Sequence, residues 1–416
     1  MPRHPPRSPP QFPSRRLLLG VAASVPQLLV VSCASPARLA AVPSALTAKA
    51  QASVPNARFF PDRNDPALID EAMASYRKEL AWLASTGHTG PLPPVAFLTI
   101  SGGGGDGAFG AGLLTGWTEA GTRPSFKLVT GISTGALIAP FAFLGPRYDP
   151  TLSETYTTVS DSDIFKKRNF TAVLFSDAMA DTAPLGRLVS KYVTRELLDA
   201  IAAEYAKGRL LLIGTTNLDS REPVYWNMGA IASSQDPAAL TLFRQITVAS
   251  ASIPGAFPPM MIDVTVDGVR YQEMHVDGGA TRQVFMYPQT LRLAEQSAAM
   301  GADRKRAVYI IRNSRLDPDW ASTDRRMLSI VNRAVSSLIQ TQGFGDLNRM
   351  YLTTMRDHVD YNLAYIPSDF NVPKKGQFDI AYMTPLFQRG RQMAAGGYPW
   401  AKYPPGYDPA DAAKTP

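Results

Sequence analysis

The chain has 416 residues, 45% of them hydrophobic and 19% charged, and carries a formal net charge of +7 at pH 7. Its length and apolar content suffice for one large α/β domain or two smaller ones with a filled core. Its basic residues form no dense run, and recognition of a nucleic-acid backbone needs a clustered basic face, so we expect no nucleic-acid partner. Because Cys33 is the single cysteine, an intramolecular disulfide and a cysteine-rich metal site are excluded.

The first 33 residues are typical of an export signal. Arg15-Arg16 precede an apolar stretch that runs from Leu17 to Val31, which is too short to span a bilayer as a helix but fits a signal peptide. The arginine pair resembles a twin-arginine signal, and two ordinary arginines before a general export signal fit equally well. Val30-Val31-Ser32-Cys33 resembles a lipobox, at which bacterial lipoproteins are cleaved and diacylated on cysteine. We therefore expect residues 1–33 to end in a lipidated Cys33 on an exported lipoprotein, at the outer membrane and facing the periplasm.

Two segments separate this signal from the first predicted strand. Residues 34–60 are rich in Ala, Pro and Ser with little periodicity, which predicts a flexible tether. Residues 61–94 contain Asp65-Pro66, an N-cap followed by a first helical residue, and apolar side chains then recur every three or four positions as far as Leu83. This pattern predicts an amphipathic leading helix followed by a linker.

The region 95–315 reads as a catalytic α/β domain. Its first segment, Val95–Ile100, is an uninterrupted apolar run of strand length. Helical patterns, such as the one that begins near Thr194, separate it from further runs of this kind, and this alternation predicts a mostly parallel sheet with helices on both faces. These further runs are residues 127–130, 209–213 and 306–311.

One antiparallel hairpin is expected within this domain, because Asp267-Gly268 separates two stretches of alternating apolar residues. After the domain, residues 322–358 look helical, so we assign 316–395 to a C-terminal helical extension packed on it. Residues 396–416 are expected to form an irregular tail.

Gly131-Ile132-Ser133-Thr134-Gly135 follows a strand-like run and precedes an apolar stretch. This is the strand–turn–helix context of a G-x-S-x-G nucleophile elbow, in which Gly131 and Gly135 leave room for a strained turn that exposes the serine. We interpret Ser133 as a nucleophile.

A second glycine-rich loop, Ser101 to Gly107, follows the strand that ends at Ile100 and leads into a helical pattern. It lacks the Lys-Ser/Thr ending of a nucleotide-binding P-loop. In a chain that also has a nucleophile elbow, convergent backbone amides of Gly102, Gly103, Gly104 and Gly105 serve better as an oxyanion hole.

The serine needs a base, and the histidines are scarce. Asp277-Gly278-Gly279 follows a strand-like run, which places a carboxylate at a strand end, and such a carboxylate can accept the serine proton if burial raises its pKa. A conventional α/β hydrolase triad with His275 or His358 is the rival interpretation.

Together, the glycine loop, the elbow at 131–135 and Asp277-Gly278-Gly279 resemble the patatin-like phospholipases and lipid acyl hydrolases. The resemblance covers about residues 95–315. It implies a three-layer sandwich, hydrolysis of phospholipid or other acyl esters by a dyad of Ser133 and Asp277 without histidine, and no cofactor for the chemistry. Calcium dependence and head-group preference stay open. Supporting stretches are Asp181–Leu185, Ile213–Asn217 and Ala249–Pro259.

Asp106 departs from the family pattern, which usually has Arg or Lys at this position. We expect its carboxylate to cap the helix that starts at Gly107 and to face away from the oxyanion hole. The departure also motivates an alternative function, a catalytically silent lipoprotein of the same fold that binds lipid or a partner. A candidate lid is the segment 150–185, rich in Ser, Thr and Asp. Sequence does not decide the oligomeric state.

Overall fold

The computed structural model describes residues 37–63, 66–167, 177–318, 320 and 322–407. The expected export signal, Cys33 included, lies outside the described residues. Residues Ser35–Pro416 form one compact unit, to which all that follows refers. Within the described part of this unit, no helix has the length and hydropathy of a membrane-spanning segment.

The unit is built on a nine-stranded sheet whose centre is five parallel strands. Four of the five correspond to the apolar runs in the sequence, and the run from Val95 to Ile100 matches its strand residue for residue. The prediction of a mostly parallel sheet is thereby confirmed. In spatial order the strands are β6 (Leu210–Asn217), β3 (Phe126–Gly131), β2 (Val95–Ile100), β10 (Arg306–Arg315) and β11 (Asp360–Ile366).

The predicted hairpin is also present. Asp267 and Gly268 connect β8 (Met260–Val266) to β9 (Val269–Asp277), and both turn residues have positive φ, 49° and 82°, as a tight hairpin turn requires. β9 pairs antiparallel with β6, which sets Asp277 opposite Thr215.

Three short antiparallel pairs were not anticipated. β7 (Glu222–Asn227) folds back on β6, and β1 (Arg58–Phe59) pairs with β7. β4 (Lys166–Lys167) and β5 (Ala180–Asp181) form a separate ribbon.

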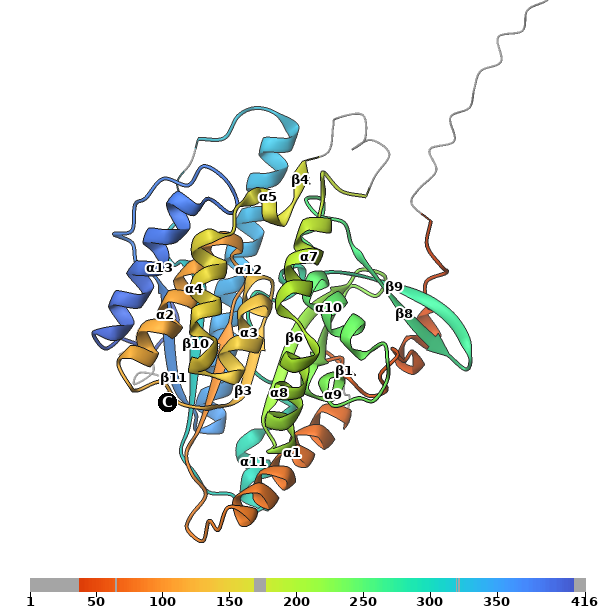
Figure 1. Cartoon of the computed structure of the whole chain (residues 1–416), viewed down its shortest axis with the longest axis vertical. Helices are drawn as coiled ribbons and strands as arrows, with labels where there is room; N and C mark the ends of the chain where they lie inside the picture. Colours follow the sequence, from red (N-terminus) through yellow and green to blue (C-terminus); the bar gives the residue numbers. More distant parts are fainter. Residues whose placement is uncertain (1–36, 64–65, 168–176, 319, 321, 408–416) are drawn as a thin grey trace, which may run out of the picture. The chain divides into compact units, whose positions relative to one another are not determined.

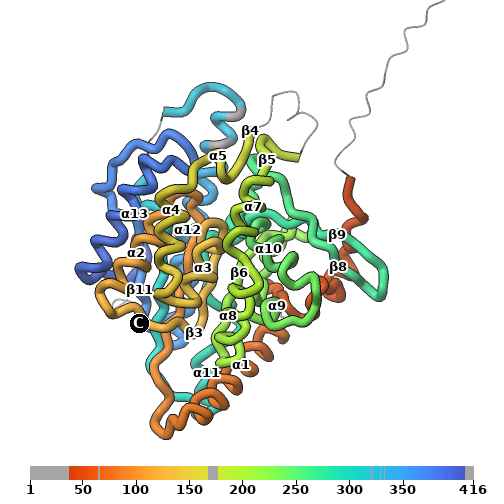
Figure 2. The backbone as a smooth tube through the Cα atoms, viewed as in Figure 1, coloured from red at the N-terminus to blue at the C-terminus, as the bar shows by residue number. Residues whose placement is uncertain are grey.

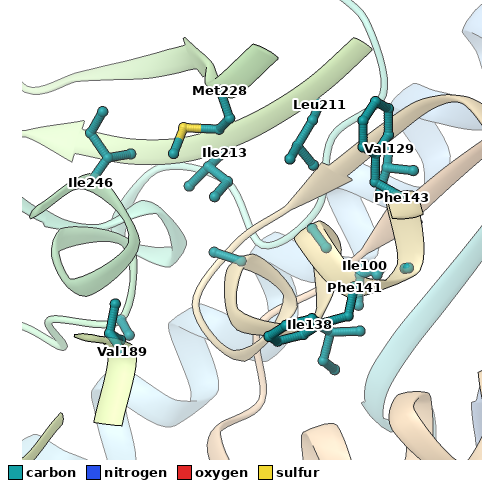
Figure 3. Close-up of a cluster of buried hydrophobic side chains, with 14 of the residues drawn as sticks. Ile100, Val129, Ile138, Phe141, Phe143, Val189, Leu211, Ile213, Met228 and Ile246 are labelled. Carbon is teal, nitrogen blue, oxygen red and sulfur yellow. The ribbon is translucent and has the colours of Figure 1, made fainter. Parts of the chain in front are cut away.

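Helices cover both faces of the sheet, and each face has its own apolar cluster. Side chains alternate along a strand, so in β2 Leu98 and Ile100 belong to one cluster and Val95 and Phe97 to the other. Figure 3 shows part of the first cluster, which β2, β3 and β6 share with helices (Figure 1). These helices are α2 (Gly107–Glu119), α3 (Thr134–Leu144), α4 (Asp149–Thr158), α7 (Ala183–Tyr192), α8 (Arg195–Ala206), α9 (Met228–Ala232), α10 (Ala239–Ser250) and α13 (Ile380–Ala395).

The second cluster is covered by α1 (Pro66–Ser85), α11 (Leu293–Ala299) and α12 (Met327–Asp357). α1 begins at the predicted Pro66, and α12 accounts for the helical pattern over 322–358. The remaining short helix, α5 (Asp161–Ile164), follows α4.

The expected tether is wrong for residues 37–60. Residues Ser44–Lys49 form a 3-10 helix, Gln51 bridges to Thr265 on β8, and β1 joins the sheet. The small apolar residues of this segment, such as Val42 and Ala57, are buried. Alanine-rich sequence therefore packs here because the edges of β7 and β8 supply backbone partners.

The expected C-terminal helical extension is also corrected. Besides α12 and α13, it contains β11, which pairs in parallel with β10 and continues the central sheet. The irregular tail is tied to this strand, because Ala401 forms a bridge with Leu363. The α/β domain therefore extends well beyond residue 315.

Candidate active site

Ser133 lies in the turn between β3 and α3 with φ 56° and ψ −122°, a left-handed conformation that costs energy for a residue with a side chain. The two flanking glycines are sterically required. A Cβ on Gly131 would lie 2.3 Å from the carbonyl oxygen of Gly135, and one on Gly135 would lie 2.2 Å from that of Ile100. The predicted strand–turn–helix context of the elbow is present.

Asp277 ends β9 and lies beside Ser133. β6 brings the two together, because β3 and, farther along, β9 pair with the same side of β6, while β7 pairs with its opposite side. The Asp277 carboxylate is hydrogen-bonded to the Ser133 side chain, and its Oδ1 accepts the backbone N–H of Gly279 at 2.7 Å. Its backbone N–H donates to the carbonyl of Ser252 at 2.9 Å.

Burial raises the pKa of Asp277 to about 7, because the hydrogen bonds from Ser133 and Gly279 offset only part of the loss of solvation. Asp277 is 5% exposed. A carboxylate with this pKa can hold a proton at neutral pH and release it again, which general acid–base catalysis requires.

The described histidines are placed for other roles. Both ring nitrogens of His275 are engaged, Nδ1 at 2.9 Å from Thr215 Oγ1 and Nε2 at 3.1 Å from Glu273 Oε2. His358 immediately precedes β11, whereas Ser133 follows the end of β3, and these ends lie at opposite edges of a parallel sheet. The geometry therefore does not favour the histidine triad.

The glycine loop lies next to the nucleophile. A Cβ on Gly102 would be 3.2 Å from Ser133 Cβ, and Gly104 lines the same pocket as Ser133. The amide of Gly102, however, donates to the carbonyl of Gln283 at 3.2 Å. This amide is therefore engaged elsewhere, which leaves Gly103, Gly104 and Gly105 as the oxyanion-hole candidates.

Asp106 does not behave as expected. It occupies the N-cap position of α2, but its side chain makes no capping hydrogen bond. Its Oδ1 instead accepts a hydrogen bond from Lys374 Nζ at 2.7 Å, and this cation lies 268 residues along the chain. The capping prediction was wrong because a partner from a distant loop offers a full charge, which outweighs a backbone amide.

Three positioning residues were missed by the sequence interpretation. Ser250 Oγ accepts the backbone N–H of Ser133 at 3.0 Å and donates to the carbonyl of Gly214, which ties the elbow to β6. Asn313 Nδ2 donates to the carbonyl of Ser101 at 2.9 Å and its Oδ1 accepts the N–H of Gly110, so it holds both ends of the glycine loop. The third is Gln283, whose backbone carbonyl accepts the N–H of Gly102. Asn313 had one local signal, a polar residue two positions after the end of a predicted strand.

An apolar pocket opens beside Ser133. Ile164 of α5 and Leu185 of α7, both within the predicted lid segment 150–185, contribute to it, whereas residues 168–176 lie outside the described part of the chain. The residues that line this pocket are Gly104, Ser133, Thr134, Leu137, Ile164, Leu185, Ala251, Ile253, Phe257 and Phe378.

Among the described residues, no group of three or more His, Cys, Asp or Glu side chains is arranged to hold a metal ion.

In comparisons with known proteins, a family model matches the region that contains both Ser133 and Asp277. Residues 98–286 match the family model described as Patatin-like phospholipase. No curated protein matches the chain. Among solved structures, VipD from Legionella pneumophila is similar, with 12% identity over 73% of this chain and 67% of that chain and a TM-score of 0.35. The type III effector protein ExoU matches with 14% identity over 74% of this chain and 53% of that chain and a TM-score of 0.27, so the match spans about half of that protein.

Proposed function

We propose that this chain is a serine acyl hydrolase that cleaves lipid carboxylic esters, because residues 98–286 match the family model of patatin-like phospholipases. One observation carries the proposal. A buried carboxylate, Asp277, with its pKa raised to about 7, is hydrogen-bonded to the side chain of a serine held in a strained elbow. This pairing supplies both the nucleophile and the base that ester hydrolysis needs.

The first half of the reaction forms an acyl-enzyme. Ser133 Oγ attacks the ester carbonyl carbon while Asp277 takes the hydroxyl proton. The carbonyl oxygen becomes an oxyanion, for which the amides of Gly103, Gly104 and Gly105 are the candidate donors. Loss of one such donor typically raises the barrier by about 3 kcal/mol. The tetrahedral intermediate then breaks its C–O bond to the leaving alcohol, which takes the proton from Asp277.

The second half repeats this chemistry with water. Asp277, ionised again, takes a proton from water as its oxygen attacks the acyl carbon, and the new intermediate expels Ser133 Oγ, which recovers the proton. The free fatty acid leaves. The elbow and the base keep one geometry through both halves, and Ser250 supports this by fixing the Ser133 amide.

The apolar pocket supports an acyl-chain substrate. Its wall includes large side chains, among them Leu137, Ile253 and Phe257. Transfer of a methylene from water to such surroundings contributes about 0.8 kcal/mol. We therefore expect kcat/KM to rise as the acyl chain of a soluble ester is lengthened.

The decisive experiment combines active-site labelling with activity. The full chain is treated with a fluorophosphonate probe, and release of fatty acid is measured from p-nitrophenyl esters and from mixed phospholipid vesicles. Labelling at Ser133, and loss of hydrolysis in both Ser133→Ala and Asp277→Asn, are the expected results. Ser153→Ala on α4 and Asp263→Asn on β8 are matched controls that should keep full activity.

Absence of labelling and of hydrolysis in the unaltered chain would favour the alternative, a catalytically silent protein of the same fold that binds lipid or a partner. Asp106 was the feature in its favour. The pairing of Asp106 with Lys374 weakens this argument, because the negative charge beside the glycine loop is largely compensated.

We also propose that the mature protein is anchored in the outer membrane through acyl chains on Cys33 and faces the periplasm. The support is the sequence of residues 1–33. Membrane fractionation after labelling cells with a radioactive fatty acid tests it. The Cys33→Ser variant should lose the label and the salt-resistant association with membranes, and retention of the label would refute the anchor.

A further inference from the structure

The two halves of α12 differ in what covers them. From Gly343 onward the helix packs on the sheet, and Leu347 and Met350 belong to the second apolar cluster. The first half, 327–340, instead carries large apolar side chains in contact with solvent. Their exposed fractions are Met327 77%, Ile330 53%, Val331 49%, Val335 45% and Leu338 70%.

These side chains form one stripe. They recur at intervals of three and four residues, which places them on one face of an α-helix. Ser329, Ser336 and Gln340 occupy the opposite face of the same turns. Hence the first half of α12 is an amphipathic helix whose apolar face is turned to solvent, an arrangement that marks an interaction surface. We call the five residues the apolar stripe.

Basic and aromatic side chains accompany the stripe. Residues 322–340 contain three arginines, Arg325, Arg326 and Arg333, against one acidic residue, Asp324. Trp320, just before them, is 87% exposed. An apolar helix face bordered by arginines and a tryptophan fits the boundary between the head groups and the acyl chains of a lipid layer.

The apolar stripe lies at the active-site end of the unit. Figure 2 shows the first turns of α12 at the same end as α5 and the start of α7, which contribute Ile164 and Leu185 to the pocket. Hydrogen bonds connect this part of α12, through Asp317 and Arg315, to the loop that contains Phe370. Gln340 Nε2 donates to the carbonyl of Asp317 at 3.4 Å, and Arg315 Nη1 donates to the carbonyl of Phe370 at 2.9 Å.

The loop that contains Phe370 continues to the glycine loop. Lys374 in this loop pairs with Asp106, and Phe378 lines the pocket of Ser133. The first half of α12 is therefore connected to the pocket through residues 315–317 and the segment 370–378.

We propose that the apolar stripe, with Trp320, Arg325 and Arg326, docks the protein on an anionic phospholipid surface and so presents lipid to the pocket. Charge complementarity selects an anionic lipid layer as the occupant. The arginines attract the head groups, while the stripe enters the region of the acyl chains. The benefit for catalysis rests on the proposed function, whereas docking itself is a binding event that is measured without hydrolysis.

The test places a fluorophore on each side of the helix. In the full chain with Cys33→Ser and Ser133→Ala, Leu338→Cys or Ser336→Cys carries an environment-sensitive label. Two residues correspond to about 200° of helix rotation, so the labels report opposite faces. With vesicles of ether-linked phosphatidylglycerol and phosphatidylcholine, we expect a blue shift for the label at 338 and little change at 336.

Arginine variants then separate the contribution of charge to docking from the contribution of apolar contact. Arg325→Ala and Arg326→Ala should each weaken partitioning into anionic vesicles about fivefold, as expected for one basic residue near an anionic surface. Added salt should weaken it as well. Equal affinity for pure phosphatidylcholine vesicles would overturn the choice of an anionic surface, and the absence of a blue shift at 338 on any vesicle would overturn docking.

A second copy of the chain is the competing occupant. A blue shift at 338 without vesicles, together with a doubled mass in sedimentation, would overturn the proposal in favour of a dimer.

Activity provides an independent readout in the chain with intact Ser133. Ile330→Ser/Leu338→Ser should hydrolyse a short soluble ester at the normal rate but phospholipid vesicles at least about tenfold more slowly, since the two exposed side chains contribute apolar burial only on lipid. Loss of both activities, or of neither, would contradict the proposed link between docking and catalysis. If the unaltered chain hydrolyses no ester, the proposed function fails, while the fluorescence results still decide the docking.

Discussion

Two buried carboxylates lie four residues apart on β9, and their surroundings give them opposite properties. Glu273 accepts hydrogen bonds from the guanidinium of Arg58 and from His275. Burial raises its pKa, but the bonds from His275 and Arg58 and their charges more than offset this and hold it at about 2. Asp277 receives hydrogen bonds from a hydroxyl and an amide, and burial raises its pKa to about 7.

The difference shows what makes a carboxylate a base. Both side chains are almost fully enclosed, at 1% and 5% exposure, so burial alone does not distinguish them. A cation within hydrogen-bond distance fixes Glu273 in its charged form. Asp277 is bound by neutral donors, so its proton affinity stays high enough to accept a proton from Ser133. The environment of Glu273 therefore suits a structural ion pair, and that of Asp277 suits the proposed role of catalytic base.

The largest effect is expected for Asp277→Asn. We expect kcat/KM to fall by about 10³-fold or more, because an amide cannot take the serine proton. We also expect this inactive variant to be more stable than the parent above neutral pH, since it removes a carboxylate that is costly to ionise in a buried site. Chemical denaturation at about pH 8 and at about pH 4 measures this.

The sign of the stability effect follows from the raised pKa of Asp277. Between its usual value, 3.8, and about 7 the unfolded chain ionises this group while the folded chain keeps it protonated, so folding stability falls as the pH rises through this range. At about 1.4 kcal/mol for each pH unit, the gain in Asp277→Asn reaches up to about 4 kcal/mol above pH 7 and vanishes near pH 4. Equal stability of both proteins at every pH would contradict a raised pKa.

For Glu273→Gln we expect the opposite pattern, a lower stability with the active site retained. Removal of one partner leaves Arg58 charged and buried, which costs about 3–5 kcal/mol of unfolding free energy, whereas the active-site geometry should survive. Fluorophosphonate labelling of the folded fraction should therefore proceed at a rate close to that of the parent. Glu222→Gln is the control, because its pair with Arg63 is partly exposed and such pairs contribute less than about 1 kcal/mol.

The pH–rate profile should reflect the pKa of Asp277. Since the ionised carboxylate is the base in the proposed mechanism, kcat/KM for a soluble ester should fall about tenfold for each pH unit below about 7 and level off above it. Steady-state rates from about pH 5 to 9 measure this. A profile that is flat down to about pH 4 would show that Asp277 is not the base whose ionisation limits the rate.

The smallest effect is expected for Lys374→Ala. Its ion pair with Asp106 is partly exposed, so we expect a stability loss below about 1 kcal/mol. The unpaired carboxylate beside the glycine loop should repel the oxyanion and lower kcat about threefold to tenfold. Asp106→Asn in the same background should restore kcat, and Lys374→Arg should retain it. Failure of Asp106→Asn to rescue would remove Asp106 from the electrostatics of the site.

Local sequence determined the parts of this protein that depend on near neighbours. The apolar run Val95–Ile100 became β2 without a shift, and Asp267-Gly268 gave the predicted hairpin because both residues tolerate positive φ. The elbow around Ser133 was recognisable because its constraint, the absence of Cβ atoms on either side, is written within five residues. The family resemblance on these motifs indicated the fold class, which the structure confirms, together with the candidate site residues.

Tertiary structure alone decided which groups meet. Glu273 and Asp277 look alike in sequence, and the partner that separates them, Arg58, is 215 residues from Glu273. Likewise, Lys374 reaches Asp106 and Gln283 occupies the Gly102 amide only after the strands have assembled. A pattern in the sequence fixes the conformation of a few consecutive residues, whereas a buried group's charge state depends on solvent exclusion and on donors and charges from the whole fold.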